Sequence, residues 1–66
     1  MTVTLNGQPR DVTPGLSLED LVTHLTSAPS GVAAAVNETV VPRRRWRAVT
    51  LVEGDRIEVL TAVQGG

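Results

Sequence analysis

The chain of 66 residues contains no cysteine, and this absence limits the folds and sites available to it more than any other feature. A domain this small buries only about 60% of the surface that its unfolded chain exposes, so such chains commonly need disulfides or a metal as support. Without cysteine, the chain cannot form a disulfide framework, a zinc–thiolate site or a redox thiol. Its single histidine, His24, also excludes a metal site with several histidine ligands. The fold must therefore depend on one small apolar core, and we expect no bound metal or cofactor.

The charged residues exclude further classes of protein. All six basic residues are arginine, so a lysine Schiff base is impossible. The formal net charge of −1 argues against a protein whose main task is to hold nucleic acid. No apolar run approaches the roughly 20 residues that a membrane-spanning helix requires. Residues 1–11 lack a positive region followed by an apolar stretch, so we expect no signal peptide, no membrane association and a cytoplasmic location.

The first half of the chain predicts a hairpin followed by a helix. Thr2–Leu5 alternate polar and apolar side chains, and Asn6-Gly7 is typical of a tight hairpin turn. The second arm, about Pro9–Val12, contains a proline that cannot donate to a neighbouring strand, so we expect it at a sheet edge. Ser17 and Asp20 form a variant of the capping box and predict the start of a helix of nine or ten residues.

The second half predicts short strands and one longer strand. Val32–Val36 is a short apolar run that fits an inner strand, and Val40-Val41 fits a brief one. Arg43–Arg47 is interpreted as an irregular surface stretch, whereas Ile57–Ala62 alternate as a final strand does. The predicted fold class is α+β, with one helix across a mixed sheet in residues 1–62 and a flexible tail in residues 63–66. The predicted core is Val3, Leu5, Leu18, Leu21, Val22, Leu25, Val36, Ile57 and Val59.

The final Gly65-Gly66 is the feature that points to chemistry. Glycine is conformationally costly and adds nothing to a core, so one interpretation is simply a frayed end. The other is that a partner enzyme threads a slim tail through a narrow channel and acts on its carboxylate. A carboxylate is ionised at neutral pH and resists nucleophilic attack, so it needs activation, for example by adenylation with ATP. A sulfur nucleophile such as a partner's persulfide could then convert it to a thiocarboxylate.

Several segments together resemble the ThiS family, the sulfur carriers of thiamin biosynthesis. The segment from Glu53-Gly54-Asp55 through Val59, followed by residues 61–66, is similar to the end of that family's sequences. Ala35-Val36-Asn37, Val40–Arg43 and Trp46 match its middle segment, and the Asn6-Gly7 hairpin also fits. The resemblance covers essentially the whole chain. Two segments depart from it: Glu38-Thr39 stands where the family often has Gly-Glu, and Arg44-Arg45 stands where polar or acidic residues are common.

The resemblance implies a ubiquitin-like β-grasp fold and a carrier with no catalytic residues of its own. It implies that Gly66 is adenylated by an E1-like enzyme of the ThiF type, which consumes ATP, and then carries the thiocarboxylate. Gly65, Gln64 and Val63 would thread into the partner enzymes. The implied partners are that adenylating enzyme, a thiazole synthase of the ThiG type and a sulfur donor such as a cysteine desulfurase.

Two alternatives stay open at this point. One is a sulfur carrier of another pathway, such as the small subunit of molybdopterin synthase, although that family is usually longer and its tail differs from Ala62–Gly66. The other is a small RNA- or protein-binding module that uses Arg43–Trp46, with an incidental tail. We expect His24 to be a solvated residue without a role, and Trp46 to be a packing residue.

Overall fold

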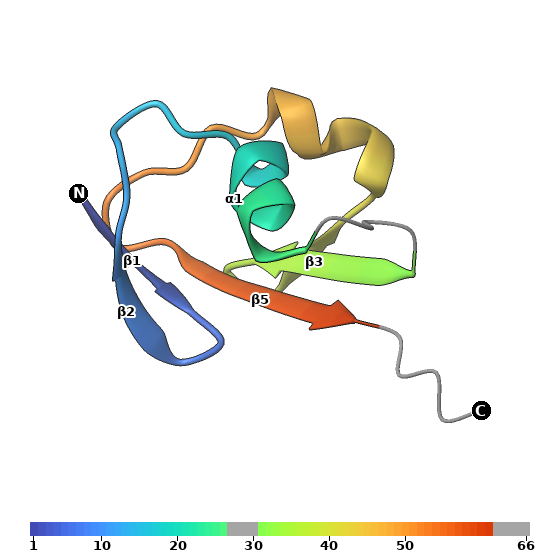
Figure 1. Ribbon diagram of the computed structural model, residues 1–66, viewed down its shortest axis with the longest axis horizontal. Coiled ribbons are helices and arrows are strands. Elements are labelled where there is room, and N and C mark those ends of the chain that lie inside the picture. Colours follow the sequence, from blue (N-terminus) through green and yellow to red (C-terminus); the bar gives the residue numbers. More distant parts are fainter. Residues whose placement is uncertain (27–30, 62–66) are drawn as a thin grey trace.

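The chain forms a five-stranded mixed sheet with one helix packed across it, which confirms the predicted α+β class (Figure 1). The computed structural model describes residues 1–26 and 31–61. The strands lie in the order β2-β1-β5-β3-β4, with β5 at the centre. β1 pairs with β5 in parallel, and the other neighbouring strands are antiparallel. In chain order the elements are β1 (Thr2–Leu5), β2 (Gln8–Asp11), α1 (Leu18–Leu25), β3 (Val32–Val36), β4 (Thr39–Val41), the 3-10 helix η1 (Arg43–Ala48) and β5 (Arg56–Thr61).

Two tight turns set the register of the outer strands. Asn6 and Gly7 both have positive φ, 51° and 83°, which is the backbone that the turn between β1 and β2 requires. Asn37 and Glu38, with φ of 50° and 71°, make the equivalent turn between β3 and β4. β2 lies at the sheet edge, so the position predicted from Pro9 is confirmed.

Helix α1 begins with the predicted capping box. The Asp20 backbone N–H donates to Ser17 Oγ over 3.0 Å, and the Ser17 backbone N–H donates to Asp20 Oδ2 over 3.4 Å. The helix has eight residues rather than nine or ten, because Thr26 already adopts extended backbone, which β-branched residues favour. No helix within the described ranges is long and apolar enough to cross a membrane.

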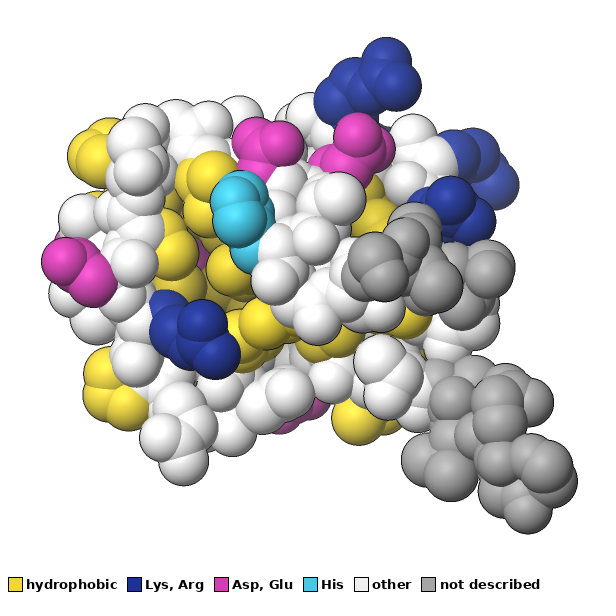
Figure 2. Space-filling model, in the orientation of Figure 1, with side chains coloured by type: hydrophobic (Ala, Val, Ile, Leu, Met, Phe, Trp, Pro, Cys, Tyr) yellow, Lys and Arg dark blue, Asp and Glu magenta, His cyan; other side chains and the backbone are white. Residues whose placement is uncertain are grey.

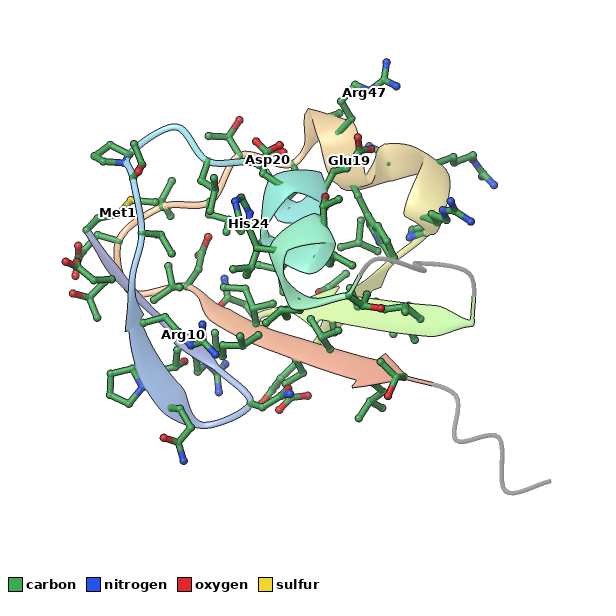
Figure 3. All side chains as sticks on the ribbon, in the orientation of Figure 1. Met1, Arg10, Glu19, Asp20, His24 and Arg47 are labelled. Atoms are coloured by element: carbon green, nitrogen blue, oxygen red, sulfur yellow. The ribbon has the colours of Figure 1, made fainter. Side chains whose placement is uncertain are left out.

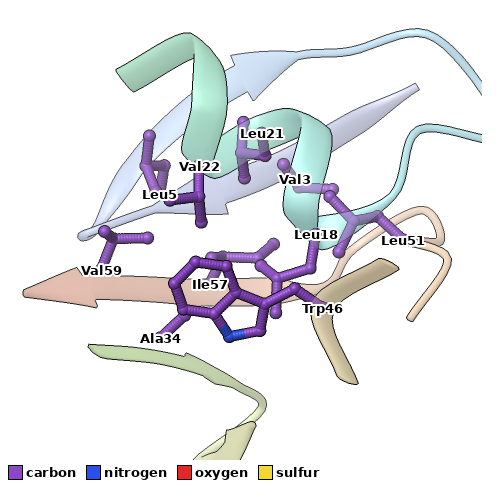
Figure 4. Packing of buried hydrophobic residues seen from close by; sticks show 10 residues of the cluster. All are labelled: Val3, Leu5, Leu18, Leu21, Val22, Ala34, Trp46, Leu51, Ile57 and Val59. Carbon is purple, nitrogen blue, oxygen red and sulfur yellow. The ribbon is translucent and has the colours of Figure 1, made fainter. Parts of the chain in front are cut away.

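The core lies between the sheet and α1 (Figure 4). The prediction for Leu25 was wrong: its side chain is 37% exposed, since it lies in the last helical turn at the rim of a hollow beside β2 and β5. Val36 is only half-buried against the core. Trp46, Leu51 and Ala34 are core residues that the predicted set omitted. The buried apolar residues are Val3, Leu5, Leu18, Leu21, Val22, Ala34, Trp46, Leu51, Ile57 and Val59.

The structure also corrects the prediction for the arginine-rich stretch. Residues Arg43–Ala48 form a 3-10 helix and not an irregular surface stretch. The Trp46 side chain is 2% exposed, and its Nε1–H donates to the Val41 carbonyl over 2.8 Å. One buried aromatic ring with a satisfied N–H therefore fixes this helix to the core, which confirms the packing role expected for Trp46.

Candidate functional site

The candidate site begins where the central strand ends. β5 ends at Thr61, which pairs with Val32 of β3. On its other side β5 pairs with β1 only near its start, through Thr4↔Arg56 and Leu5↔Ile57. The second half of β5 therefore continues beyond the end of β1, toward residues 62–66.

Asn6 supports the part of β5 that β1 does not reach. Its Oδ1 accepts from the Val59 backbone N–H over 2.9 Å, and its Nδ2 donates to the Val59 carbonyl over 3.1 Å. The side-chain amide thus satisfies the Val59 backbone N–H and carbonyl on the side where β1 has ended. This contact extends the sheet by one position toward the end of β5.

Asn37 fixes the other end of the same strand. Its Oδ1 accepts from the Arg56 backbone N–H, and its Nδ2 donates to Asp55 Oδ1, both over 3.0 Å. Asp55 is 8% exposed, and its second oxygen accepts from the Val52 backbone N–H over 2.9 Å. The buried carboxylate is therefore fully engaged in holding the turn that leads into β5. The sequence predicts Asn6 in a turn, and the side-chain contacts of Asn6 and Asn37 with β5 were not predicted.

We expect Asn6→Ala to reduce the free energy of unfolding by about 1–3 kcal/mol, because it removes both amide contacts and places alanine at positive φ. Urea unfolding followed by Trp46 fluorescence measures this. Asn6→Gly is the matched variant, since glycine tolerates the backbone and loses only the amide. A stability of Asn6→Ala equal to that of the wild type would show that the amide does not support β5.

The residues predicted to carry the chemistry lie outside the described part of the chain. These are Val63, Gln64, Gly65 and Gly66, and the expected flexible tail falls there too. His24 is exposed, as expected, and its Nδ1 lies 2.6 Å from the Asp20 carbonyl oxygen one helical turn earlier. Within residues 1–26 and 31–61, no three His, Asp or Glu side chains gather as metal ligands would.

The sheet face opposite α1 carries exposed apolar side chains close to the end of β5. Leu60 is 69% exposed and pairs with Ala33, and Val40 is 72% exposed and pairs with Ala35. The side chains alternate along β5, so Ile57 and Val59 enter the core while Leu60 points away from it. This face can contribute apolar surface to a protein contact.

Comparisons with known proteins agree with this fold. A family model described as the ThiS family matches residues 3–66. The sulfur carrier protein ThiS of Escherichia coli is 29% identical over 66 residues, and the match covers all of both chains. A thiazole synthase of Magnetococcus marinus is 42% identical over 66 residues, and this chain spans 20% of that protein's length.

A solved structure gives the same result. The crystal structure of the thiamine biosynthesis protein ThiS from Geobacter metallireducens matches with a TM-score of 0.81 and 32% sequence identity, over 100% of both chains. The β-grasp arrangement of sheet and helix is therefore common to both proteins. Since the family model covers nearly the whole sequence and the fold agrees, the chain belongs to the ThiS family.

Proposed function

We propose that this chain is a sulfur carrier for the thiazole moiety of thiamin, a protein substrate that partner enzymes modify. The observation that carries the proposal is the family match over residues 3–66, which includes the Gly65-Gly66 ending. The described fold supports it, because β5 leads from the centre of the sheet toward that ending. The folded body would then present the tail, and the partner enzymes would supply the catalytic groups.

The proposed reaction begins at the Gly66 carboxylate. One carboxylate oxygen attacks the α-phosphorus of ATP, pyrophosphate leaves, and an acyl adenylate forms. A persulfide sulfur then attacks the acyl carbon and AMP leaves, which gives an acyl disulfide. A second thiol cleaves the S–S bond, forms a disulfide with the donor sulfur and releases the thiocarboxylate. An E1-like enzyme of the ThiF type would supply the ATP site, and a cysteine desulfurase would supply the persulfide sulfur, so the carrier itself needs no cofactor.

The proposed acceptor is a thiazole synthase of the ThiG type. Support comes from the Magnetococcus marinus relative, a protein named thiazole synthase that contains a segment similar to this whole chain. A thiocarboxylate is a better nucleophile than a carboxylate, so the carrier can deliver sulfur without having a cysteine. The exposed apolar side chains of Leu60 and Val40 offer a surface on which such a partner can rest.

Adenylation can be tested by isotope exchange. Purified chain, ATP, labelled pyrophosphate and a ThiF-type enzyme are mixed, and label entering ATP is counted. We expect exchange that depends on the chain and saturates with its concentration. Exchange that proceeds equally without the chain would contradict the proposed role of Gly66.

We expect Gly65→Val to lower the rate of thiocarboxylate formation by about 10- to 100-fold, because a branched side chain obstructs a channel that admits only backbone. Gly65→Ala adds the smallest side chain and should lose less. Quantitative mass spectrometry at fixed times measures both yields, and the thermal midpoints of the two variants should match that of the wild type. Equal yields from the wild type and Gly65→Val would show that the diglycine serves no threading purpose.

A further inference from the structure

Four of the six arginines lie within five residues of η1, and the reaction proposed above uses none of them. We call Arg43, Arg44, Arg45 and Arg47 the arginine cluster. All four are exposed. Ion pairs in the described part of the chain join the Met1 amino group to Asp11 and Arg56 to Glu38, and neither pair involves the cluster. The fold therefore places four positive charges on one short element without neutralising them by direct ion pairs.

The geometry of η1 places Arg44 and Arg47 on one face, away from the face of the buried Trp46. A 3-10 helix has three residues per turn, so side chains three positions apart lie above one another. Trp46 is buried and anchors η1, whereas Arg44 and Arg47 line one surface hollow with Arg43 and Glu19. Figure 3 shows Arg47 projecting from η1 near Glu19 of α1. The Glu19 carboxylate balances part of the charge in this hollow, and the arginines remain in excess.

The arginine cluster follows the end of β4, which runs in the same direction as β5 with β3 between them. Val41, the last residue of β4, is opposite Ala34 of β3, which is opposite Val59 of β5. η1 begins at Arg43, two residues after Val41. β5 ends at Thr61, two residues after Val59. Figure 1 shows η1 above the sheet, on the face that carries α1, in the half of the molecule toward which β5 runs. A protein that receives the residues after Thr61 and also covers this half of the molecule therefore meets the cluster.

Two acidic residues, Asp11 and Glu53, lie at the opposite end of the sheet. Asp11 pairs in register with Thr2 at the start of β1, and Glu53 Oε1 accepts from the Thr2 backbone N–H over 2.9 Å. In Figure 2 the dark blue side chains are concentrated over η1, apart from the one that Figure 3 labels Arg10. Although the net charge is only −1, the charges are distributed asymmetrically over the molecule. Such a distribution can orient the chain in the electric field of a partner.

We propose that the arginine cluster binds an acidic surface of the adenylating enzyme, outside the channel that takes the residues after Thr61. This inference rests on the proposed function. Complementary charge steers encounter and fixes orientation, so it should act mainly on association. The observations favour an acidic protein over RNA, because the single aromatic ring, Trp46, is buried and offers no base a stacking platform.

The test compares two double variants that change the net charge equally. R44Q/R47Q removes two charges from the cluster, and R10Q/R56Q removes two charges from elsewhere. Pyrophosphate exchange is measured with the adenylating enzyme at 20 mM and 300 mM NaCl. We expect R44Q/R47Q to raise KM for the chain about 10-fold at low salt with kcat unchanged, and to weaken its salt dependence. R10Q/R56Q should stay within about twofold of the wild type.

The outcomes separate this inference from the proposed function. If the wild-type chain supports exchange and the two double variants have equal KM, the docking inference is wrong and the proposed function stands. If the wild-type chain supports no exchange, the proposed function fails and the inference fails with it. Circular dichroism checks that both variants fold. A titration with single-stranded RNA at 150 mM NaCl is the second arm: tight binding that R44Q/R47Q abolishes would assign the cluster to RNA and overturn the docking inference.

Discussion

Deletion of Gly66 is expected to abolish adenylation and to leave the free energy of unfolding unchanged within about 0.5 kcal/mol. The reacting carboxylate would move one residue back, to Gln64-Gly65, and would no longer reach the α-phosphorus of ATP. Stability should not change, because Gly66 lies five residues beyond Thr61, the last residue of β5. Pyrophosphate exchange and urea unfolding measure the two effects on the same preparation.

The matched control for this deletion is the addition of one glycine after Gly66. This variant keeps the diglycine and displaces the carboxylate in the other direction, so it should also lose most activity. Adenylation of the deletion variant at the wild-type rate would refute the assignment of Gly66. If the deletion also lowered the free energy of unfolding, Gly66 would instead contribute to the folded body.

Trp46→Ala is expected to lower the free energy of unfolding by about 3–5 kcal/mol, a large part of the total for a small domain. The substitution removes the largest core side chain and leaves the Val41 carbonyl without the indole N–H that donates to it. Trp46→Phe is the matched variant, because it retains an aromatic ring and loses the hydrogen bond, so it should cost less. Urea unfolding followed by circular dichroism measures both variants, and a loss below about 1 kcal/mol for Trp46→Ala would contradict the anchoring role of Trp46.

The elements that the sequence predicts well are those set by local chemistry. Asn6-Gly7 predicts a turn because both residues tolerate positive φ, and the capping box of Ser17 and Asp20 predicts the start of α1. The alternation in β5 is equally local, since it separates Ile57 from Leu60 by sheet face. Each of these signals needs only a few neighbouring residues to operate.

The errors concern where α1 ends and how segments far apart in the chain pack together. Leu25 belongs to the apolar stripe of α1, yet the helix ends there and leaves it partly exposed. The arginines of η1 suggest a solvated loop, and only the packing of Trp46 against the core shows why a helix forms. The Asn6 contact with Val59 joins positions 53 residues apart, so the turn sequence alone could not predict it.

The candidate site is predicted in a different way. Local physics offers two interpretations of Gly65-Gly66, a frayed end or a threaded tail, and cannot choose between them. The resemblance over the whole chain favours the carrier, and the family match over residues 3–66 confirms the family. The chemistry at Val63, Gln64, Gly65 and Gly66 stays a prediction, because these residues lie outside the described part of the chain.

Intact-mass spectrometry shows whether the chain gains sulfur at its last residue. The chain is incubated with ATP, a ThiF-type adenylating enzyme, a cysteine desulfurase, cysteine and a thiol reductant, and its mass is compared with that of an incubation without ATP. We expect replacement of one oxygen by sulfur, located at Gly66 by fragmentation and absent without ATP. An unchanged mass, under conditions in which the Escherichia coli ThiS protein gains sulfur from its own partner enzymes, would contradict it.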